Sequence, residues 1–300
     1  YSFGSVSTFL FILLFISLQD SYSLKSNYEN FRNISTYIRN FSFSTKKNKL
    51  IDNYNKNCLP NYITELPINS SVIIGHAYGR PPLTIKDSIN ISPKVYKFLN
   101  KNRARISTVF FTGDIFFTPS LYKWKKLYKD FSTDFEIIIA PGNHEVARSN
   151  NLRRDLFNAY VGRKQPSEFP FYLNRSQFNI IVDDSTVRQT YLNQKNFNLQ
   201  HSKLYENLLI IRHHASIKEV SIYSDVHYNL TTKSELEDRF GDFNKVIIIS
   251  GNAGIKYPDI RTFCYRHSNI LHLESGIGEF DKDNVLVLYK GRIYRYLIRN

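Results

Sequence analysis

The feature that most constrains this chain is an apolar run that stops at Pro141-Gly142 and is followed by polar residues. The run, Phe135–Ala140, predicts a strand that is covered on both faces of a sheet. Ligands of such sheets bind just beyond the carboxyl ends of the strands, where Asn143, His144 and Glu145 would lie. Taken alone, the segment fits equally well with a tight Gly-Asn turn that happens to precede a histidine.

Four other segments repeat this design, since each is an apolar run that ends in Asp, Asn or His. They are Val72–Gly75 before His76, Ser107–Gly113 before Asp114, Leu208–Arg212 before His213 and His214, and Val246–Gly251 before Asn252. If these runs are strands of α/β sheets, their polar ends would lie along one sheet edge. Oxygen and imidazole groups are the ligands of hard and borderline metal ions. The sequence therefore predicts a metal site at this edge.

This order of motifs resembles the calcineurin-like metallophosphoesterase superfamily over about residues 70–300. The most specific piece is Gly142–Glu145, and Gly113-Asp114 precedes it at an ordinary spacing. The resemblance implies an α/β fold of two sheets that form a β-sandwich flanked by helices, in four layers α/β/β/α. It also implies a metal-dependent phosphoesterase, in which a metal-bound hydroxide attacks a phosphate mono- or diester.

The resemblance assigns roles to four residues that match the family's motifs. Asp114 would be the carboxylate that bridges the family's two metal ions, while Asn143 and His213 would be metal ligands. His144 would be the catalytic acid, or would contact a phosphate oxygen. Each role suits the side chain, since a carboxylate neutralises charge, an amide oxygen and an imidazole are neutral ligands, and a second imidazole can transfer a proton.

The chain departs from the family at the first and the last of these motifs. Where the family begins with Asp-x-His, this chain has His76-Ala77-Tyr78, and where the family has Gly-His-x-His, Gly251–Gly254 reads Gly-Asn-Ala-Gly. The ligands that are missing from this chain belong mainly to one of the family's two metal ions. We therefore expect a reduced or rewired site that holds one divalent ion (Mn, Fe, Zn or Mg) rather than two, with His76 and Asn252 as substitute ligands.

The partner predicted from this resemblance is a phosphorylated small molecule, or a phosphorylated glycan or lipid. Tyr78 and Arg80, in the loop after the first strand, are the predicted substrate-binding residues. The alternative is a catalytically inactive module with this fold, which binds an anion or assembles in an envelope or membrane pathway. The missing Asp and His ligands motivate that alternative.

Composition narrows the partners further. The net charge of +14 comes from Lys and Arg that are scattered along the chain, and no nucleic-acid-binding motif accompanies it, so a nucleic-acid partner is not favoured. Two cysteines, Cys58 and Cys264, exclude a cysteine-based zinc cluster. A single disulfide between them is compatible with export.

The first residues predict a targeting segment. The apolar stretch Phe9–Leu18 has the length of a signal-peptide core and is shorter than a membrane span, and Ser21-Tyr22-Ser23 offers a cleavage site. We assign residues 1–24 to a signal peptide or membrane anchor, 25–70 to an extension, and 71–300 to the metallophosphoesterase-like domain. We therefore expect an exported or membrane-anchored protein. The alternative is a cytoplasmic protein in which Phe9–Leu18 forms a buried helix. The absence of Met suggests an incomplete N-terminus.

Helices and further strands are predicted around these motifs. Ser92-Pro93 opens a helix that runs to about Asn100, and Thr118–Ser120 opens a second that runs to Tyr128. Residues 148–163 are expected to be partly helical. Residues 269–274, 284–289 and 292–298 read as three strands, with Lys290-Gly291 as a hairpin turn.

Overall fold

The computed structural model describes residues 57–79, 91–146, 151–187, 192, 205–221, 230–252, 262–278 and 281–299. The chain divides into two units, Tyr1–Ile51 and Asp52–Asn300, and the described residues all belong to the second. The predicted signal segment, most of the extension and Arg80 lie outside the described residues. Among the helices of the described part, none combines the length and the apolar character that a membrane crossing requires.

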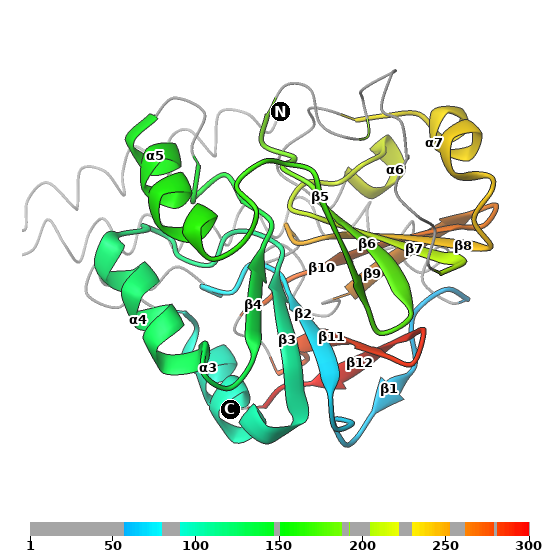
Figure 1. Ribbon diagram of the computed structural model, residues 1–300. Coiled ribbons are helices and arrows are strands. Elements are labelled where there is room, and N and C mark those ends of the chain that lie inside the picture. Colours follow the sequence, from blue (N-terminus) through cyan, green and yellow to red (C-terminus); the bar gives the residue numbers. More distant parts are fainter. Residues whose placement is uncertain are drawn as a thin grey trace, which may run out of the picture. The chain divides into compact units, whose positions relative to one another are not determined.

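The second unit is a mixed α/β structure built on two six-stranded sheets (Figure 1). Its strands are β1 (Tyr62–Ile63), β2 (Ser70–Ile74), β3 (Ile106–Phe111), β4 (Glu136–Ile139), β5 (Phe171–Arg175), β6 (Phe178–Val182), β7 (Asn207–Arg212), β8 (Lys245–Ser250), β9 (Thr262–His267), β10 (Ile270–Ser275), β11 (Asn284–Tyr289) and β12 (Arg292–Leu297). Its helices are α3 (Pro93–Lys101), α4 (Leu121–Phe131), α5 (Asn151–Tyr160), α6 (Lys218–Ser221) and α7 (Lys233–Phe240), with 3-10 turns at Arg103–Arg105 and Val161–Arg163.

The strand order explains where a site can form. The first sheet has the order β1-β12-β11-β2-β3-β4, and the second has the order β5-β6-β7-β8-β10-β9. β2, β3 and β4 are parallel to one another, with α3 and α4 as their crossover connections. In the second sheet, β6, β7, β8 and β10 are parallel. The five strands predicted to end in polar residues are β2, β3, β4, β7 and β8. The expectation that their ends lie along one sheet edge was wrong, because β2, β3 and β4 belong to the first sheet and β7 and β8 to the second.

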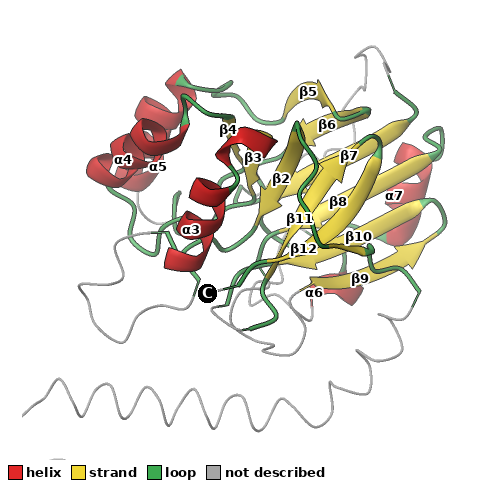
Figure 2. Ribbon diagram, turned by 90° about the horizontal axis from the view of Figure 1, so that it is seen from below, coloured by secondary structure: helices red, strands yellow, loops and turns green. Residues whose placement is uncertain are grey.

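The two sheets pack face to face, and helices cover their outer faces. Alternate residues of each strand point to opposite faces, so Ile73 and Phe110 join Ile211 of the second sheet in the core between the sheets. Val72 and Val109 point the other way, into a second core with the helices. Figure 2 shows α3, α4 and α5 beside the first sheet and α6 and α7 beside the second. This arrangement confirms the predicted α/β/β/α layers.

Local sequence explains the helix boundaries. Pro93 occupies the first turn of α3, directly after Ser92, as predicted. The predicted start of α4 is confirmed, because the Ser120 hydroxyl accepts a hydrogen bond from the Lys123 N–H and so caps a helix that begins at Leu121. That helix continues beyond the predicted end at Tyr128 to Phe131, which is fully buried.

The helix and the three strands predicted for the other segments are present in the structure. α5 lies within the stretch expected to be partly helical. β10, β11 and β12 match the three expected strands to within a residue, and Lys290 and Gly291 form the turn between the last two with φ values of 46° and 70°. Positive φ at both central residues is the requirement of a type I′ hairpin turn.

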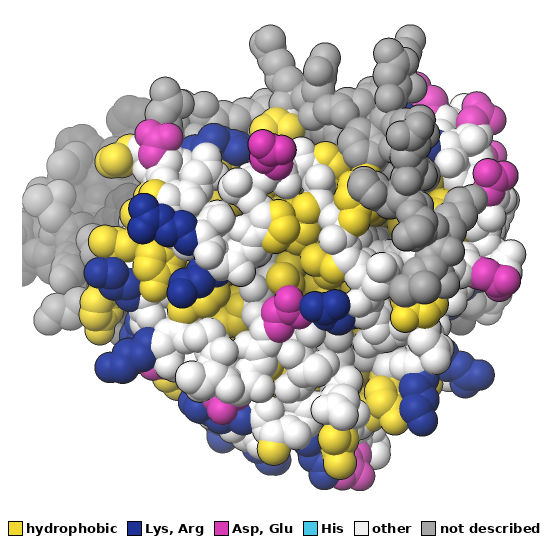
Figure 3. All heavy atoms as spheres, viewed as in Figure 1, with side chains coloured by type: hydrophobic (Ala, Val, Ile, Leu, Met, Phe, Trp, Pro, Cys, Tyr) yellow, Lys and Arg dark blue, Asp and Glu magenta, His cyan; other side chains and the backbone are white. Residues whose placement is uncertain are grey.

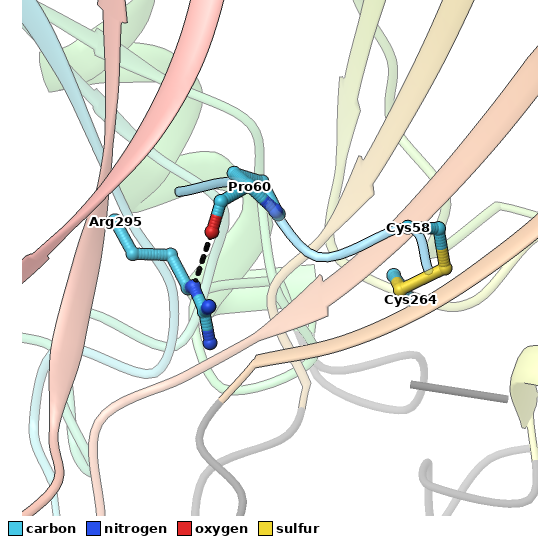
Figure 4. Close-up of a disulfide and its surroundings, with 4 residues drawn as sticks. All are labelled: Cys58, Pro60, Cys264 and Arg295. Atoms are coloured by element: carbon cyan, nitrogen blue, oxygen red, sulfur yellow. Dashed lines mark hydrogen bonds between the residues drawn. A yellow bond between two sulfur atoms is a disulfide. The ribbon is translucent and has the colours of Figure 1, made fainter. Parts of the chain in front are cut away.

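A disulfide joins Cys58 to Cys264 and ties the segment before β1 to β9 (Figure 4). The same segment is held by a hydrogen bond of 2.7 Å from Arg295 Nε to the carbonyl of Pro60. The two cysteines are 206 residues apart in the sequence. A bridge across so long a segment restricts the unfolded chain strongly.

We therefore expect the double substitution Cys58→Ser with Cys264→Ser to lower the free energy of unfolding by about 2–5 kcal/mol. Urea denaturation of the parent and the variant measures the change. A reductant should lower the midpoint of the parent and leave that of the variant unchanged. A parent whose midpoint does not respond to full reduction would contradict the expectation.

Candidate functional site

The carboxyl ends of parallel strands from both sheets meet at one place. In the first sheet, the N–H of His76 donates to the carbonyl of Gly113 at 3.3 Å, which links the ends of β2 and β3. In the second sheet, the N–H of Gly251 donates to the carbonyl of His213 at 3.0 Å, which links the ends of β7 and β8. The predicted residues Asp114, Asn143, His144, His213 and His76 are brought together here.

Asp114 lies at the centre of this group. Its side chain is buried, and its backbone has a φ of +55°, in the left-handed region that few residues other than glycine adopt. One carboxylate oxygen, Oδ1, accepts the N–H of His144 at 3.1 Å. Burial raises the pKa of Asp114. The positive charge that His213, His144 and His76 can carry lowers it by more, so the pKa lies below its usual value. Asp114 is therefore ionised at neutral pH.

Two glycines of the predicted motifs allow the backbone to approach this carboxylate. Gly113 has a φ of +82°, and a Cβ at this position would lie 2.6 Å from His213 Nδ1. A Cβ on Gly142 would lie 2.5 Å from Asp114 Oδ1. Since real Cβ atoms do not come so close, only glycine fits at either position. The Gly-Asp and Gly-Asn motifs thus have a steric cause.

Glu145 shapes the loop that carries Asp114, a role that sequence reasoning missed. Its fully buried carboxylate accepts four backbone N–H groups. The donors are Asp114 at 2.7 Å, Ile115 at 2.8 Å, Phe116 at 3.3 Å and Gly142 at 3.1 Å. Burial and then the charge on Asp114 raise the pKa of Glu145, which the hydrogen bonds oppose. The only signal in the sequence was the position of Glu145 at the end of the Gly-Asn-His-Glu motif.

Glu145→Gln should therefore destabilise the fold, because the amide NH₂ of glutamine would face N–H donors that now have a carboxylate oxygen. We expect a loss of about 1–3 kcal/mol in the free energy of unfolding, the cost of a buried donor without an acceptor. Urea denaturation measures it. Glu136→Gln is the control, since Glu136 is an exposed carboxylate that pairs with Arg175. Equal stability of the Glu145→Gln variant and the parent would exclude this role.

Three histidines face Asp114 in the same way. The Nδ1 atom of each lies within hydrogen-bond distance of a backbone carbonyl oxygen: His213 with Thr112 at 2.8 Å, His144 with Phe117 at 2.7 Å, and His76 with Ile277 at 3.2 Å. A carbonyl oxygen only accepts, so we assign the Nδ1 proton to each ring. The Nε2 atom of each ring then lies on the side away from its carbonyl.

Those Nε2 atoms all point at the carboxylate. His213 Nε2 lies 3.4 Å from Asp114 Oδ1, while the Nε2 atoms of His76 and His144 both lie 4.0 Å from Asp114 Oδ2. For His76, burial lowers the pKa to about 4, so this ring is neutral at neutral pH. A neutral ring whose Nδ1 carries the proton offers no hydrogen to the carboxylate. His76 therefore offers an acceptor nitrogen to the centre.

Asn143 adds a further oxygen to this centre. Its Oδ1 lies 2.9 Å from His213 Nε2. Asp114 Oδ1, Asn143 Oδ1 and His213 Nε2 thus form a mixed set of one carboxylate, one amide and one imidazole, which fits a divalent cation of the Mn, Fe or Zn type. No group of three or more His, Cys, Asp or Glu side chains within the described ranges is arranged to hold a metal ion. The fit therefore depends on the amide of Asn143.

The other predicted site residues have different surroundings. Tyr78 is buried among aromatic rings, with its ring centroid 4.1 Å from that of His76 and 5.2 Å from that of His144. The backbone N–H of Asn252 donates to Glu274 Oε1 at 3.1 Å. Arg80, the second predicted substrate-binding residue, falls outside the described residues.

A buried ion pair between Arg212 and Asp183 was also missed by sequence reasoning. Arg212, directly before His213, is fully buried, and its Nη1 lies 3.6 Å from Asp183 Oδ2. Burial lowers the pKa of Arg212, while the charges of Asp183 and Glu274 oppose that effect. The available signal was an arginine at the end of a mostly apolar strand.

Comparison with known proteins finds remote structural matches and no similar sequence. No known protein family matches the chain, and no curated protein is similar to it. Among solved structures, one match is a purple acid phosphatase isolated from yellow lupin (Lupinus luteus) seeds, with 10% identity and a TM-score of 0.44. The match covers 79% of this chain and 55% of the lupin protein, so the chain spans about half the length of that protein.

A second match is a predicted phosphoesterase from Streptococcus pneumoniae. It has 10% identity and a TM-score of 0.30, and the match covers 76% of this chain and 97% of the other. Likenesses this remote carry no argument about activity. The activity of this chain is therefore inferred from its own residues.

Proposed function

We propose that this chain is a metal-dependent phosphoesterase with one divalent cation at the Asp114 centre. The observation that supports this proposal is the convergence of acceptor atoms. Three imidazoles, each oriented through Nδ1 by a backbone carbonyl, direct Nε2 at one buried carboxylate. A bound divalent cation would balance the charge of the buried carboxylate and meet these ring nitrogens.

Asp114, Asn143 and His213 would hold the ion, and His76 would lie beside it. A divalent cation in this position supplies Lewis acidity to a phosphoryl oxygen and to water. The buried Glu145 carboxylate keeps the loop of Asp114 in place through its four N–H contacts. The burial of His76 and His213 excludes water from two sides of the centre.

His144 is the proposed proton donor. Its side chain is 22% exposed, whereas those of His76 and His213 are 6% and 0% exposed, so His144 is the histidine that a substrate can reach. The Phe117 carbonyl fixes its ring through Nδ1. When protonated, Nε2 would donate to the leaving oxygen of a phosphate ester. Tyr78, whose ring packs on His144, would hold that ring in place.

The substrate class is a phosphate mono- or diester of a small molecule, glycan or lipid, met outside the cytoplasm or at a membrane. The disulfide between Cys58 and Cys264 supports export, because such bonds persist mainly in oxidising compartments. The predicted signal segment at residues 1–24 agrees with it. The proposal does not include nucleic acid.

Elemental analysis of the purified chain, followed by turnover of an aryl phosphate under Mn, Fe, Zn and Mg, tests the proposal. We expect one equivalent of metal and turnover above a blank that contains metal alone. The second candidate is a non-catalytic anion-binding module, favoured by the absence of a group of three His, Cys, Asp or Glu ligands in the described ranges. A chain with no metal and no turnover would support that candidate and overturn the first.

A further inference from the structure

Two histidines that do not belong to the group around Asp114 meet on the outer face of the second sheet. His267 ends β9 and His272 lies in β10, and these two strands form an antiparallel hairpin. Leu271 and Leu273, on either side of His272, point into the core between the sheets. His272 therefore points to the other face, beside which α6 and α7 lie (Figure 2). The Nε2 atoms of His267 and His272 are 3.0 Å apart.

Both rings are oriented through their Nδ1 atoms. His267 Nδ1 lies 3.1 Å from Oε1 of Glu237 on α7, and His272 Nδ1 lies 2.9 Å from the hydroxyl oxygen of Ser216, just before α6. A carboxylate only accepts, so we assign the proton on this side of His267 to Nδ1. Contacts of this kind, from a carboxylate to Nδ1, hold the rings of metal-ligating histidines and make the other nitrogen a better ligand.

The Nε2 atoms of the two rings face each other. Two bare lone pairs would repel at 3.0 Å, so a proton or a cation must lie between them. His272 is buried, and burial, His267 and Arg212 lower its pKa well below the usual value, so this ring is neutral at neutral pH. The positive charge of Arg212 is itself paired with Asp183. The pair therefore presents ring nitrogens to one shared position.

The spacing of the rings is close to that of two histidines on one zinc ion. With Zn–N bonds of about 2.0–2.1 Å and a tetrahedral angle, two such nitrogens lie about 3.3 Å apart and their ring centroids about 5 Å apart. For His267 and His272 these distances are 3.0 Å and 5.2 Å. A small rotation of the rings that separates the nitrogens by about 0.3 Å would thus direct both at one ion.

The surroundings of the pair favour a cation, although the whole chain has a net charge of +14. α7 carries three acidic side chains, Glu235, Glu237 and Asp238, against two basic ones. One of the basic side chains, Lys233, is paired with Glu219 at 2.9 Å. Figure 3 shows Asp and Glu side chains gathered on the side on which α7 lies. A cation that approaches from α7 therefore meets negative charge.

We propose that His267 and His272 form a second metal site, which binds one Zn²⁺ in place of the proton between their Nε2 atoms. The ion would enter beside Glu237, whose side chain is 45% exposed, and reach His267, whose side chain is 9% exposed. No group of three His, Cys, Asp or Glu ligands forms within the described ranges, so water would fill the remaining positions. A site with two protein ligands would lose its ion on dialysis, and the purified chain would keep only the ion at Asp114.

Isothermal titration calorimetry with Zn²⁺ tests the proposal on the full chain, after a chelator has removed bound metal. We expect the parent to bind one equivalent more than the His267→Phe variant, which keeps a ring but has no ligating nitrogen. Any ion at Asp114 is common to both proteins, so the difference does not depend on the proposed phosphoesterase activity. Equal Zn²⁺ uptake by the two proteins, with circular dichroism showing both folded, would overturn the proposal.

Glu237→Ala provides a second test that leaves both ring nitrogens in place. Because Glu237 is exposed, we expect this variant to fold and to bind the additional Zn²⁺ about 10- to 100-fold more weakly, the usual cost of a lost contact to a ligating histidine. The matched control is Tyr265→Phe, since Tyr265 lies directly opposite His272 in the hairpin and supplies no ligand. The control should bind like the parent. Parent-like affinity of Glu237→Ala, or an equal loss in Tyr265→Phe, would overturn the proposal.

Discussion

Asp114→Asn is expected to remove the divalent ion from the purified chain, from about one equivalent to none. Asp114 is the only acidic side chain in the proposed ligand set, and neutral ligands alone hold a divalent cation poorly. The asparagine should be tolerated by the fold, because its amide oxygen can still accept the N–H of His144 that now donates to Oδ1. Elemental analysis after dialysis measures the loss, and circular dichroism checks that the variant is folded.

The control for this substitution is Asp130→Asn, in which a half-buried carboxylate on α4 loses its charge away from the site. It should keep the metal content of the parent. A folded Asp114→Asn variant that still holds one equivalent would show that the ion is bound elsewhere. In that case the convergence of acceptor atoms on Asp114 would need another explanation, such as a protonated histidine.

The strands and their order along the chain could be predicted because they depend on local pattern. Val246–Ser250 and Phe135–Ala140 are apolar runs bounded by turn residues, and both form buried parallel strands. The residues that follow neighbouring parallel strands reach the same edge of their own sheet. The gathering of Asp114, Asn143 and His144 could therefore be expected, whereas His213 follows β7 of the second sheet and joins them only because the two sheets pack face to face.

The orientation of the site could not be predicted, since it depends on contacts between residues far apart in the sequence. His213 Nδ1 meets the carbonyl of Thr112, and His76 Nδ1 meets that of Ile277. Backbone carbonyls have no signature in a sequence. The buried contacts of Glu145 with four N–H groups were hidden for the same reason, and so was the pairing of Arg212 with Asp183.

The shared carboxylate also sets how many ions the centre can hold. His213 and Asn143 lie on the side of Asp114 Oδ1, while His76 and His144 are near Oδ2. One equivalent of metal fits the first side alone. Two equivalents would mean that His76 replaces the missing aspartate of the first motif and that His144 is itself a ligand.

His144→Ala separates these two arrangements and should have the second large effect. If His144 is a proton donor, its loss should lower kcat for an aryl phosphate by about 10²- to 10⁴-fold and leave the metal content at one equivalent. The decrease should be smaller for a substrate with a better leaving group, such as a dinitrophenyl ester, because that leaving oxygen needs less protonation.

The control for His144→Ala is Phe117→Leu, which keeps the backbone carbonyl that orients His144 and removes a ring that packs against it at a centroid distance of 5.0 Å. This control should change turnover far less than His144→Ala does, since the proton donor remains. If His144→Ala empties the site of metal, His144 is a ligand of the ion. Equal sensitivity of both phosphate esters to the substitution would remove the proton-transfer role, because protonation of the leaving oxygen would then not be what His144 contributes.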